Sequence, residues 1–332
     1  MDDPATSASG VTDPGGWGYS LANLTEIMFP CLEAAGTKSV VEIGAYRGEL
    51  TRELLGWAAG SGAHVTAVDP EPPRELLKLA DERPELELVR QTSHDALAHV
   101  PLPDALVIDS DHNYYTLSEE LRMIDSRAPG AQMPLLMFHD VAWPHARRDT
   151  YYVPERIPEE HRQPLGHDVN LAPWEPGVAD GGLPFEWAAV REGGPHNGVL
   201  TALEDFVAER SGLRLAVVSA FFGFGVLWHQ DAPWAGAVAA IVDPWDRNPV
   251  LERLEANRVT HLAARHKLAR ELEQARSRVA EQEKLLRPML ESRAFAVAER
   301  LSRLHKRGEP VLSRQQVKRA LGEPDQRSPG SS

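Results

Sequence analysis

VVEIGAYRGELT, residues Val40 to Thr51, is an apolar run that stops at an acid and continues through two glycines into helix-forming residues. A phosphate-binding loop has the pattern G-x-x-x-x-G-K-[ST], but here Gly48 is followed by Glu49 and Leu50, and a glutamate would repel a phosphate. A dinucleotide-binding loop has G-x-G-x-x-G, whereas these two glycines are spaced G-x-x-x-G. The stretch therefore predicts a strand, a glycine-containing turn and a helix that are not built to hold a pyrophosphate. An ordinary tight turn is the alternative.

Short apolar runs alternate with amphipathic segments on both sides of this stretch. The runs are almost continuously hydrophobic, as expected for strands that helices cover on both faces. Such alternation is typical of an α/β protein with a doubly wound, mostly parallel sheet, here of seven strands. The expected strands span residues 39–45, 64–70, 86–93, 104–111, 133–140, 213–221 and 224–230, and the expected helices span 20–36, 48–60, 73–84, 94–100, 116–128 and 198–212.

The last two expected strands are separated only by Phe222 and Gly223, so they should pair as an antiparallel hairpin. A parallel sheet that ends in such a hairpin differs from a plain dinucleotide-binding domain. Ligands of doubly wound sheets bind beyond the carboxyl ends of the strands. Four acids stand at the expected strand ends: Glu42, Asp69, Asp109 and Asp140.

Composition limits the classes of protein to which the chain can belong. At 332 residues and 42% hydrophobic content it can bury a substantial core, and its single cysteine, Cys31, excludes a disulfide framework and a cysteine-based zinc site. The sequence has no recognisable signal peptide and no apolar run of about eighteen residues, which predicts a soluble, cytoplasmic protein without stable membrane insertion. Residues 1–250 hold 17 Lys and Arg against 38 Asp and Glu, and their net charge of −21 argues against nucleic acid as a partner.

Over roughly residues 20–230 the chain resembles the class I S-adenosylmethionine-dependent methyltransferases. VVEIGAYRG matches the first motif of that family, whose glycine loop approaches the methionine part of the cofactor. VTAVDP ends at the place of the acid that binds the ribose hydroxyls, and QTSHDAL lies where the family contacts adenine. A sulfonium nucleoside suits these residues, because it has no phosphates, tolerates nearby acids and offers a diol to a carboxylate. The resemblance implies S-adenosylmethionine as cofactor and a cofactor-binding set of Glu42, Gly44, Ala45, Tyr46, Gly48, Asp69, Ser93, His94 and Asp109.

A second group of polar residues follows the fourth and fifth expected strands, in VIDSDHNYY and MFHDV. Neighbouring strands would bring their carboxylates to one rim, which is costly unless a cation neutralises them. Oxygen ligands with an occasional imidazole suit Mg²⁺ or Mn²⁺. The alternative is a solvated acidic rim in which Asp111 or His112 caps the next helix. The predicted metal ligands are Asp109, Asp111, His139 and Asp140.

Within the methyltransferases, this pattern is similar to the metal-dependent small-molecule O-methyltransferases, and most of all to sugar O-methyltransferases of bacterial natural-product pathways such as macrolide assembly. Asp109 falls on the first metal-binding acid of that group, and the pair His139–Asp140 falls on its later pair. His112 stands where the related plant enzymes carry a lysine that acts as base. The resemblance implies that a metal ion lowers the pKa of an acceptor hydroxyl and that His112, or failing that His139, removes its proton. Histidine in place of an acid is a departure from the pattern.

Residues 142–197 form an insertion too long for an ordinary connection, and its position predicts a lid that recognises the substrate. It is rich in Pro, Gly, Trp, Tyr and His. Its aromatic rings could stack on a sugar or an aromatic acceptor, and its histidines are reserve bases or ligands. The aromatic candidates are Trp143, Tyr151, Tyr152, Trp174 and Trp187, and the histidines are His145, His167 and His196.

The ends of the chain differ in character from its middle. We expect a loose leader over residues 1–16, a methyltransferase domain over 17–235, a helical tail over 236–307 and mostly disorder over 308–332. From Leu251 onward the chain holds 18 Lys and Arg against 11 Asp and Glu, and apolar residues follow a rough heptad up to Pro288, which should end or kink the helix. The heptad favours a coiled coil that makes a homodimer or docks a pathway partner; packing against the body is the alternative.

The sequence therefore predicts an S-adenosylmethionine-dependent O-methyltransferase that acts on a hydroxyl of a small molecule, a sugar or a glycosylated natural product, with help from a divalent metal. Two other functions stay open. One is a metal-independent methyltransferase that uses a histidine base. The other is a non-catalytic assembly protein in which the methyltransferase-like domain is a scaffold and the helical tail is the working part.

Overall fold

The computed structural model describes residues 18–305 and 313–321 of the chain. The chain divides into two compact units, Met1–His266 and Lys267–Ser332. The leader expected over residues 1–16 lies outside the described residues.

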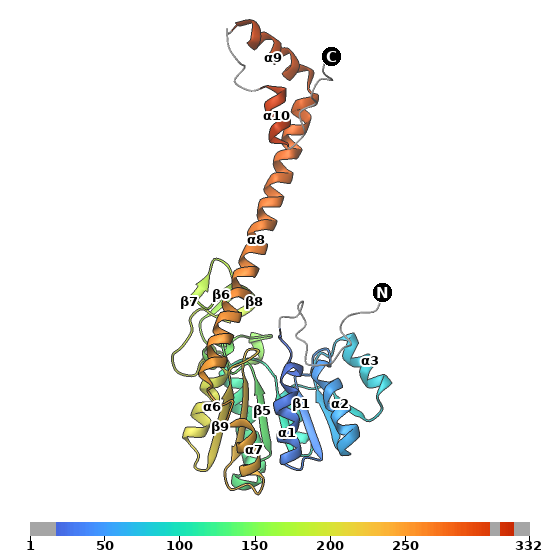
Figure 1. The fold of residues 1–332 in the computed structure, drawn as a ribbon, viewed down its shortest axis with the longest axis vertical. Coiled ribbons are helices and arrows are strands. Elements are labelled where there is room, and N and C mark those ends of the chain that lie inside the picture. Colours follow the sequence, from blue (N-terminus) through green and yellow to red (C-terminus); the bar gives the residue numbers. More distant parts are fainter. Residues whose placement is uncertain (1–17, 306–312, 322–332) are drawn as a thin grey trace. The chain divides into compact units, whose positions relative to one another are not determined.

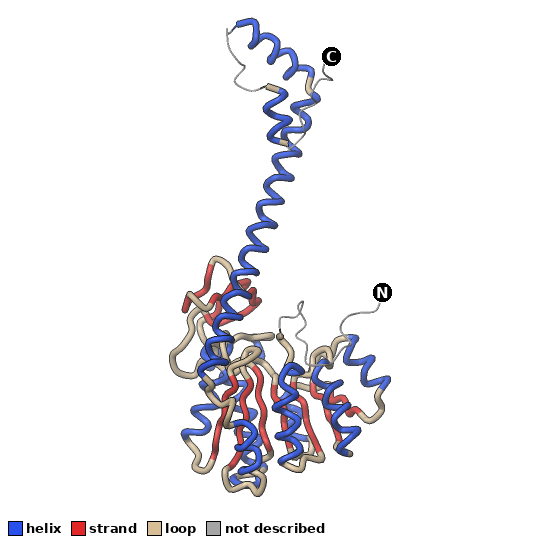
Figure 2. The backbone as a smooth tube through the Cα atoms, in the orientation of Figure 1, coloured by secondary structure: helices blue, strands red, loops and turns tan. Residues whose placement is uncertain are grey.

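A seven-stranded sheet forms the centre of the first unit, with the strand order β3-β2-β1-β4-β5-β10-β9 (Figures 1 and 2). Strands β1 to β5 run parallel to one another, whereas β10 pairs antiparallel with both β5 and β9. This confirms the doubly wound, mostly parallel sheet and its antiparallel terminal hairpin. The strands are β1 (Ser39–Ile43), β2 (His64–Val68), β3 (Leu86–Val89), β4 (Ala105–Ile108), β5 (Leu135–His139), β9 (Leu213–Val218) and β10 (Phe224–His229).

Helices cover both faces of this sheet, so successive strand residues enter different apolar layers. In β1, Val40 packs into a cluster with α1, α2, α3 and α7, whereas Val41 and Ile43 pack into a cluster with α4, α5 and α6. The two-sided burial explains why the strands read as continuous apolar runs. The helices are α1 (Thr25–Ala34), preceded by the short 3-10 helix η2 (Leu21–Leu24), α2 (Glu49–Ser61), α3 (Arg74–Glu82), α4 (Ser93–His99), α5 (Tyr114–Arg127), α6 (Val199–Ala208) and α7 (Ala235–Val242).

The predicted lid, residues 142–197, carries secondary structure that its sequence did not suggest. It contains a three-stranded antiparallel sheet, β7-β6-β8, of β6 (Leu165–Ala172), β7 (Glu175–Ala179) and β8 (Leu183–Ala189), and the 3-10 turns η4 (His145–Arg147), η5 (Pro154–Arg156) and η6 (Glu159–His161). Pro176 and Pro184 obscured the strands, but both lie in outer strands, where a missing N–H is tolerated. The buried Arg148 guanidinium anchors this sheet by donating to the carbonyl oxygens of Ala189 and Pro176 at 2.7 and 2.8 Å.

The first unit extends beyond the predicted domain end at residue 235. Helix α7 adds Val238 and Val242 to the core, and helix α8 (Pro249–Glu291) begins within the unit. Val259 and Leu262 of α8 are buried and belong to a small cluster with Phe222. The first compact unit reaches residue 266 because the apolar face of this part of α8 is packed against the body.

The second unit comprises the rest of α8 and the helices α9 (Arg293–His305) and α10 (Arg314–Ala320). Pro288 does not end α8, which continues to Glu291. Of the segment 308–332, for which disorder was predicted, residues 313–321 are described and include α10, which begins with a capping box of Ser313 and Gln316. Among the described residues, no helix is long and apolar enough to cross a membrane.

Candidate functional site

The loop after β1 lies against the end of β4, and only glycine fits at the point of contact. Gly44 has φ +85°, and a Cβ atom there would lie 1.8 Å from the carbonyl oxygen of Asp109. Backbone hydrogen bonds fix the neighbouring turns, from Gly44 N to Val68 O at 2.9 Å and from Asp109 N to Ile43 O at 2.8 Å. The predicted cofactor loop and the predicted metal-binding strand end therefore meet.

Asp69 follows β2 and links two of the loops at this edge. One carboxylate oxygen accepts a hydrogen bond from the backbone N–H of Tyr46, and the other accepts one from Glu71, both at 2.9 Å. A carboxylate has about four acceptor positions, so these two bonds leave capacity for hydroxyl donors. The fixed, largely buried carboxylate fits the diol-binding acid expected from the sequence.

Glu42 of β1 is buried and bonded within the protein. Its carboxylate accepts a hydrogen bond of 2.6 Å from the Thr51 hydroxyl of α2. The pKa of Glu42 is raised to about 8, chiefly by burial; the Thr51 hydroxyl opposes this rise, and the nearby Asp109 and Asp69 carboxylates add to it. Glu42 therefore ties the start of α2 to the sheet beneath the cofactor loop.

Other predicted cofactor-binding residues surround this loop. Ala45 is buried, Tyr46 is 59% exposed, and Gly48 is the N-terminal cap of α2 with φ +73°. Next to the loop after β4, Ser93 begins α4 and its hydroxyl interacts with the buried Glu120, to which Ser110 also donates at 3.0 Å. His94 Nε2 lies 3.1 Å from the Thr116 carbonyl. Sequence reasoning missed Glu120, since nothing distinguishes it from a surface acid of α5.

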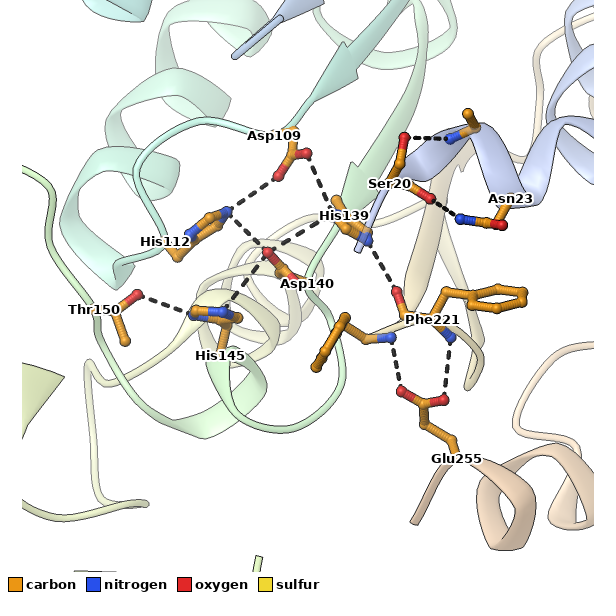
Figure 3. A network of polar contacts seen from close by, with 12 residues as sticks. Ser20, Asn23, Asp109, His112, His139, Asp140, His145, Thr150, Phe221 and Glu255 are labelled. Atoms are coloured by element: carbon orange, nitrogen blue, oxygen red, sulfur yellow. Dashed lines mark hydrogen bonds and ion pairs between the residues drawn. The ribbon is translucent and has the colours of Figure 1, made fainter. Parts of the chain in front are cut away.

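Two carboxylates and three imidazoles converge beyond β4 and β5 (Figure 3). His112 Nε2 lies 3.1 Å from Asp109 Oδ1 and 2.9 Å from Asp140 Oδ2. His139 Nδ1 lies 3.2 Å from Asp109 Oδ2 and 3.7 Å from Asp140 Oδ2. His145 Nε2 approaches Asp140 Oδ2 to 3.8 Å, while its Nδ1 lies 3.0 Å from the Thr150 hydroxyl. Adjacent parallel strands bring together most of this cluster, as predicted, and the lid adds His145.

The backbone at the end of β5 is shaped to make this convergence possible. Asp140 has φ 58°, a left-handed conformation that aspartate tolerates better than most residues. His139 is held from its other side, because its Nε2 lies 2.9 Å from the carbonyl oxygen of Phe221 in the loop between β9 and β10. A carbonyl only accepts, so Nε2 carries the hydrogen and Nδ1 faces the carboxylates.

Opposite charges dominate the electrostatics of this cluster. Burial lowers the pKa of His139, but Asp140 and Asp109 outweigh it and raise that pKa to about 9. Burial also opposes the protonation of His112, yet Tyr152, Asp140 and Asp109 raise its pKa well above 6.5. His145 behaves oppositely: burial and the neighbouring imidazolium charges lower its pKa to about 3 against the pull of Asp140.

Asp111 does not join the cluster, although the sequence predicted it as a ligand. Its Oδ1 accepts a hydrogen bond of 3.0 Å from the Tyr152 backbone N–H of the lid. Nor does Asp111 or His112 cap α5, because Asn113 does so by accepting from Thr116 N at 2.8 Å. Asp111 therefore fastens the lid to the rim.

The other lid candidates fall into three groups. Tyr152 lies at the cluster, with its ring 5.6 Å from the His112 ring and 70% of the residue exposed. Tyr151 is buried and donates its hydroxyl to Asp149 at 2.9 Å. The remaining candidates are engaged elsewhere or exposed. His167 packs on Trp187 and His196 packs on Tyr114. Trp143 is partly buried beside Phe222, and Trp174 is exposed.

Asp149 is a structural residue that the sequence did not reveal. It is fully buried, and one of its oxygens accepts from the backbone N–H groups of Tyr114 and Gly198 at 2.8 and 2.6 Å. The other oxygen accepts the Tyr151 hydroxyl. The residue joins the starts of α5 and α6 to the lid.

The ligand atoms of the cluster lie close enough together to hold a metal ion. Within the described residues, two groups of three place their ligand atoms within 4.8 Å of one another: Asp109, His139 and Asp140, and His112, Asp140 and His145. Carboxylate and imidazole donors at this spacing suit a divalent cation. The first group contains three of the four predicted ligands, and the second includes the predicted base.

Comparisons with known proteins gave one family match and several similar solved structures. Residues 41–141, from β1 to just beyond β5, match the model of a family described as a methyltransferase domain. None of the curated proteins matches the chain. One similar solved structure is a Podospora anserina methyltransferase bound to SAH, with 15% identity, a TM-score of 0.41, and coverage of 66% of this chain and 83% of that one. A second is a putative caffeoyl-CoA O-methyltransferase from Staphylococcus aureus, with 9% identity, a TM-score of 0.38, and coverage of 66% of this chain and 85% of that one. A third is an amino pentose methyltransferase from Micromonospora echinaspora, with 12% identity, a TM-score of 0.36, and coverage of 64% of this chain and 90% of that one.

The family match covers the strands that carry the cofactor loop, Asp69 and the histidine–aspartate cluster. The mostly parallel sheet with its antiparallel last hairpin is the arrangement that was expected from the sequence. Residues 41–141 therefore match a methyltransferase domain, and the sheet that contains them has the mostly parallel arrangement expected for a class I S-adenosylmethionine-dependent methyltransferase.

Proposed function

We propose that the protein is an O-methyltransferase that methylates a hydroxyl of a small molecule, a sugar or a glycosylated natural product, with help from a divalent cation. The observation that carries this proposal is the meeting of the Gly44 loop with Asp109, His139 and Asp140 at one edge of the sheet. A methyl donor held by the loop and a hydroxyl held at the cluster would be neighbours. The class of acceptor rests on the sequence resemblance.

The cofactor would be held by the loops after β1, β2 and β3. The Asp69 carboxylate is fixed by two backbone N–H groups and can accept the ribose hydroxyls. The Gly44 loop offers backbone to the methionine part, and the Ser93–His94 start of α4 lies on the side expected for adenine. S-adenosylmethionine supplies the methyl group when bound.

Asp109, His139 and Asp140 are the proposed ligands of Mg²⁺ or Mn²⁺. A divalent cation there would lower the pKa of an acceptor hydroxyl. His139 is presented by its hydrogen bond to Phe221, which leaves Nδ1 toward the carboxylates. The imidazole makes Mn²⁺ the better of the two candidates, since nitrogen ligands suit transition metals more than Mg²⁺.

His112 is the proposed base. It lies between Asp109 and Asp140, which raise its pKa and hold it protonated in their presence. Neutralising those carboxylates with a cation would remove that attraction and favour the neutral imidazole, which can take the proton of the acceptor hydroxyl. The exposed Tyr152 ring beside His112 offers a surface on which a sugar could stack.

A metal-independent methyltransferase is the second candidate, and one observation favours it. His112 and His139 already pair with both carboxylates, so the cluster is charge-compensated by protein groups alone. The experiment that separates the two candidates is methyl transfer to a panel of glycosides, followed by mass spectrometry, with and without EDTA. Loss of product in EDTA and recovery with Mn²⁺ or Mg²⁺ support the cation; full turnover in EDTA supports the histidine-only reaction.

The helical tail is proposed to join two copies of the chain. In the second unit, the side chains of Leu268, Leu272 and Val279 follow the heptad and are more than half exposed in the single chain. Such a seam is stable in water only when a partner covers it. A tail that docks an assembly partner instead would leave the purified protein monomeric.

A further inference from the structure

The loop between β9 and β10 adopts a strained backbone next to the histidine–aspartate cluster. Phe221, Phe222 and Gly223 have φ values of 52°, 68° and 97°, three left-handed residues in succession. Glycine accepts this conformation freely, whereas a bulky aromatic residue adopts it only when its surroundings enforce it. Some contact must therefore hold the two phenylalanines.

The contact is the carboxylate of Glu255 on α8 (Figure 3). It accepts hydrogen bonds from the backbone N–H groups of Phe221 at 3.2 Å and Phe222 at 2.8 Å. Glu255 is only 7% exposed, and Arg258, one turn further along α8, donates two hydrogen bonds to it at 2.6 and 2.7 Å. The Arg258 guanidinium also lies 4.3 Å from the centre of the Phe222 ring. A buried, charge-assisted clamp thus spans the two strained residues.

The clamped loop in turn sets the orientation of His139. The peptide group between Phe221 and Phe222 donates its N–H, that of Phe222, to Glu255 at 2.8 Å, and its carbonyl oxygen, that of Phe221, lies 2.9 Å from His139 Nε2. This bond places the hydrogen on Nε2 and turns Nδ1 toward Asp109. The groups that orient a ligating histidine from behind control its metal affinity nearly as strongly as the ligand itself.

We propose that Glu255 is a positioning residue for the site. It acts through the peptide group between Phe221 and Phe222 to fix the ring of His139. The first turns of α8 are then part of the methyltransferase machinery, although they lie outside the matched residues 41–141. The expected effect on metal affinity rests on the proposed function, in which His139 is a metal ligand. The expected effect on the orientation of the His139 ring does not depend on it.

The test compares Glu255→Gln with a matched control, Glu252→Gln, which changes an exposed glutamate one turn earlier on α8. Mn²⁺ and S-adenosylmethionine are titrated separately into each full-length protein by calorimetry. We expect Glu255→Gln to weaken Mn²⁺ binding by about 10- to 100-fold, the usual effect of losing an outer partner of a ligating histidine. Cofactor affinity should stay within about twofold, because Asp69 and the Gly44 loop are not touched. The control should match the wild type in both titrations.

A second readout does not depend on metal. In ¹⁵N-histidine-labelled protein, the Nε2–H of His139, assigned with His139→Gln, should give a protected signal in the wild type and the control and should disappear in Glu255→Gln. An unchanged signal together with unchanged Mn²⁺ affinity overturns the proposal. So does an equal loss of Mn²⁺ and cofactor binding, which would make Glu255 a general stabiliser of the fold.

Two further outcomes are separable. If the wild type binds no Mn²⁺, the metal part of the proposed function fails, and the His139 signal alone decides the role of Glu255. If Glu255→Gln does not fold, Glu255→Asp, which keeps the charge but shortens the reach, is measured in the same way, with the same results supporting or overturning the proposal.

Discussion

Replacing Glu42 by glutamine should change how the stability of the protein depends on pH. Glu42 is 3% exposed, and among the described residues its carboxylate accepts a hydrogen bond from the Thr51 hydroxyl. Burial raises the pKa of Glu42 from 4.5 to about 8, with Asp109 and Asp69 adding to the effect. A glutamine has a similar shape and can still accept from Thr51, but it cannot ionise.

The sign and size of the effect follow from proton linkage. Because the folded-state pKa is raised, the stabilising effect of the protonated carboxyl is fully present below about pH 4.5 and is lost as the pH rises toward about 8. Each unit of pKa difference corresponds to about 1.4 kcal/mol, so the whole shift is worth about 5 kcal/mol. Between about pH 5 and pH 8 the wild type should lose about 4 kcal/mol relative to Glu42→Gln.

The assay is urea unfolding followed by circular dichroism, without cofactor, at several values across that range. The informative quantity is the difference in unfolding free energy between wild type and variant, since groups that titrate in both proteins cancel. Glu49→Gln, at an exposed position of the same motif, should show a pH-independent difference. A flat difference for Glu42→Gln as well would refute the reasoning, because it would mean that Glu42 ionises in the folded protein as it does in water.

The other predictions concern the site and the tail. Asp69→Ala should weaken S-adenosylmethionine binding by about 1–3 kcal/mol in calorimetry, the usual value of a lost charge-assisted hydrogen-bond pair; unchanged affinity would remove Asp69 from the site. Asp109→Asn should nearly abolish methyl transfer in a mass-spectrometric assay while cofactor affinity stays close to that of the wild type, and full activity would speak against the metal site. His112→Ala should lower kcat by roughly 10²–10⁴-fold and flatten the rise of the rate with pH. In the wild type this rise follows the deprotonation of His112, whose pKa is raised. An unchanged pH profile would place the base elsewhere. Deleting residues 267–332 should give a monomer in light scattering that keeps its cofactor affinity, whereas deleting residues 249–332 should also expose the apolar cluster under α8; a full-length monomer would defeat the coiled-coil proposal.

The sheet, and the meeting of the residues at the ends of β4 and β5, could be predicted because both depend on local patterns. Strands buried on both faces are continuously apolar, and the carboxyl ends of adjacent parallel strands meet by geometry alone. That reasoning predicted that Asp109, which follows β4, would lie close to His139 and Asp140 at the end of β5. It failed for Asp111, because the side chains of successive residues in a loop point in directions that no periodicity fixes. There, the backbone of Tyr152 decides where the carboxylate goes.

Contacts that depend on how distant segments dock could not be predicted. The lid delivers His145 to Asp140, yet in the sequence this residue looks like His167 and His196, which lie elsewhere. Glu255 is similarly inconspicuous in a charged helix, and its partner Phe222 lies 33 residues earlier.

The position of Glu255 changes how the tail itself should be understood. The sequence predicts a helical tail over residues 236–307, with a heptad that favours a coiled coil and with packing against the body as the alternative. The structure divides α8 instead: Val259 and Leu262 are buried in the body, and Glu255 holds the loop that orients His139, whereas Leu268 and Leu272 leave an exposed seam. We therefore propose that the two parts of this helix serve separate purposes, the positioning of His139 before residue 266 and the association of two copies after it. A truncation that removed all of α8 would disturb the site and the seam together, so it could not distinguish a catalytic role from a role in assembly.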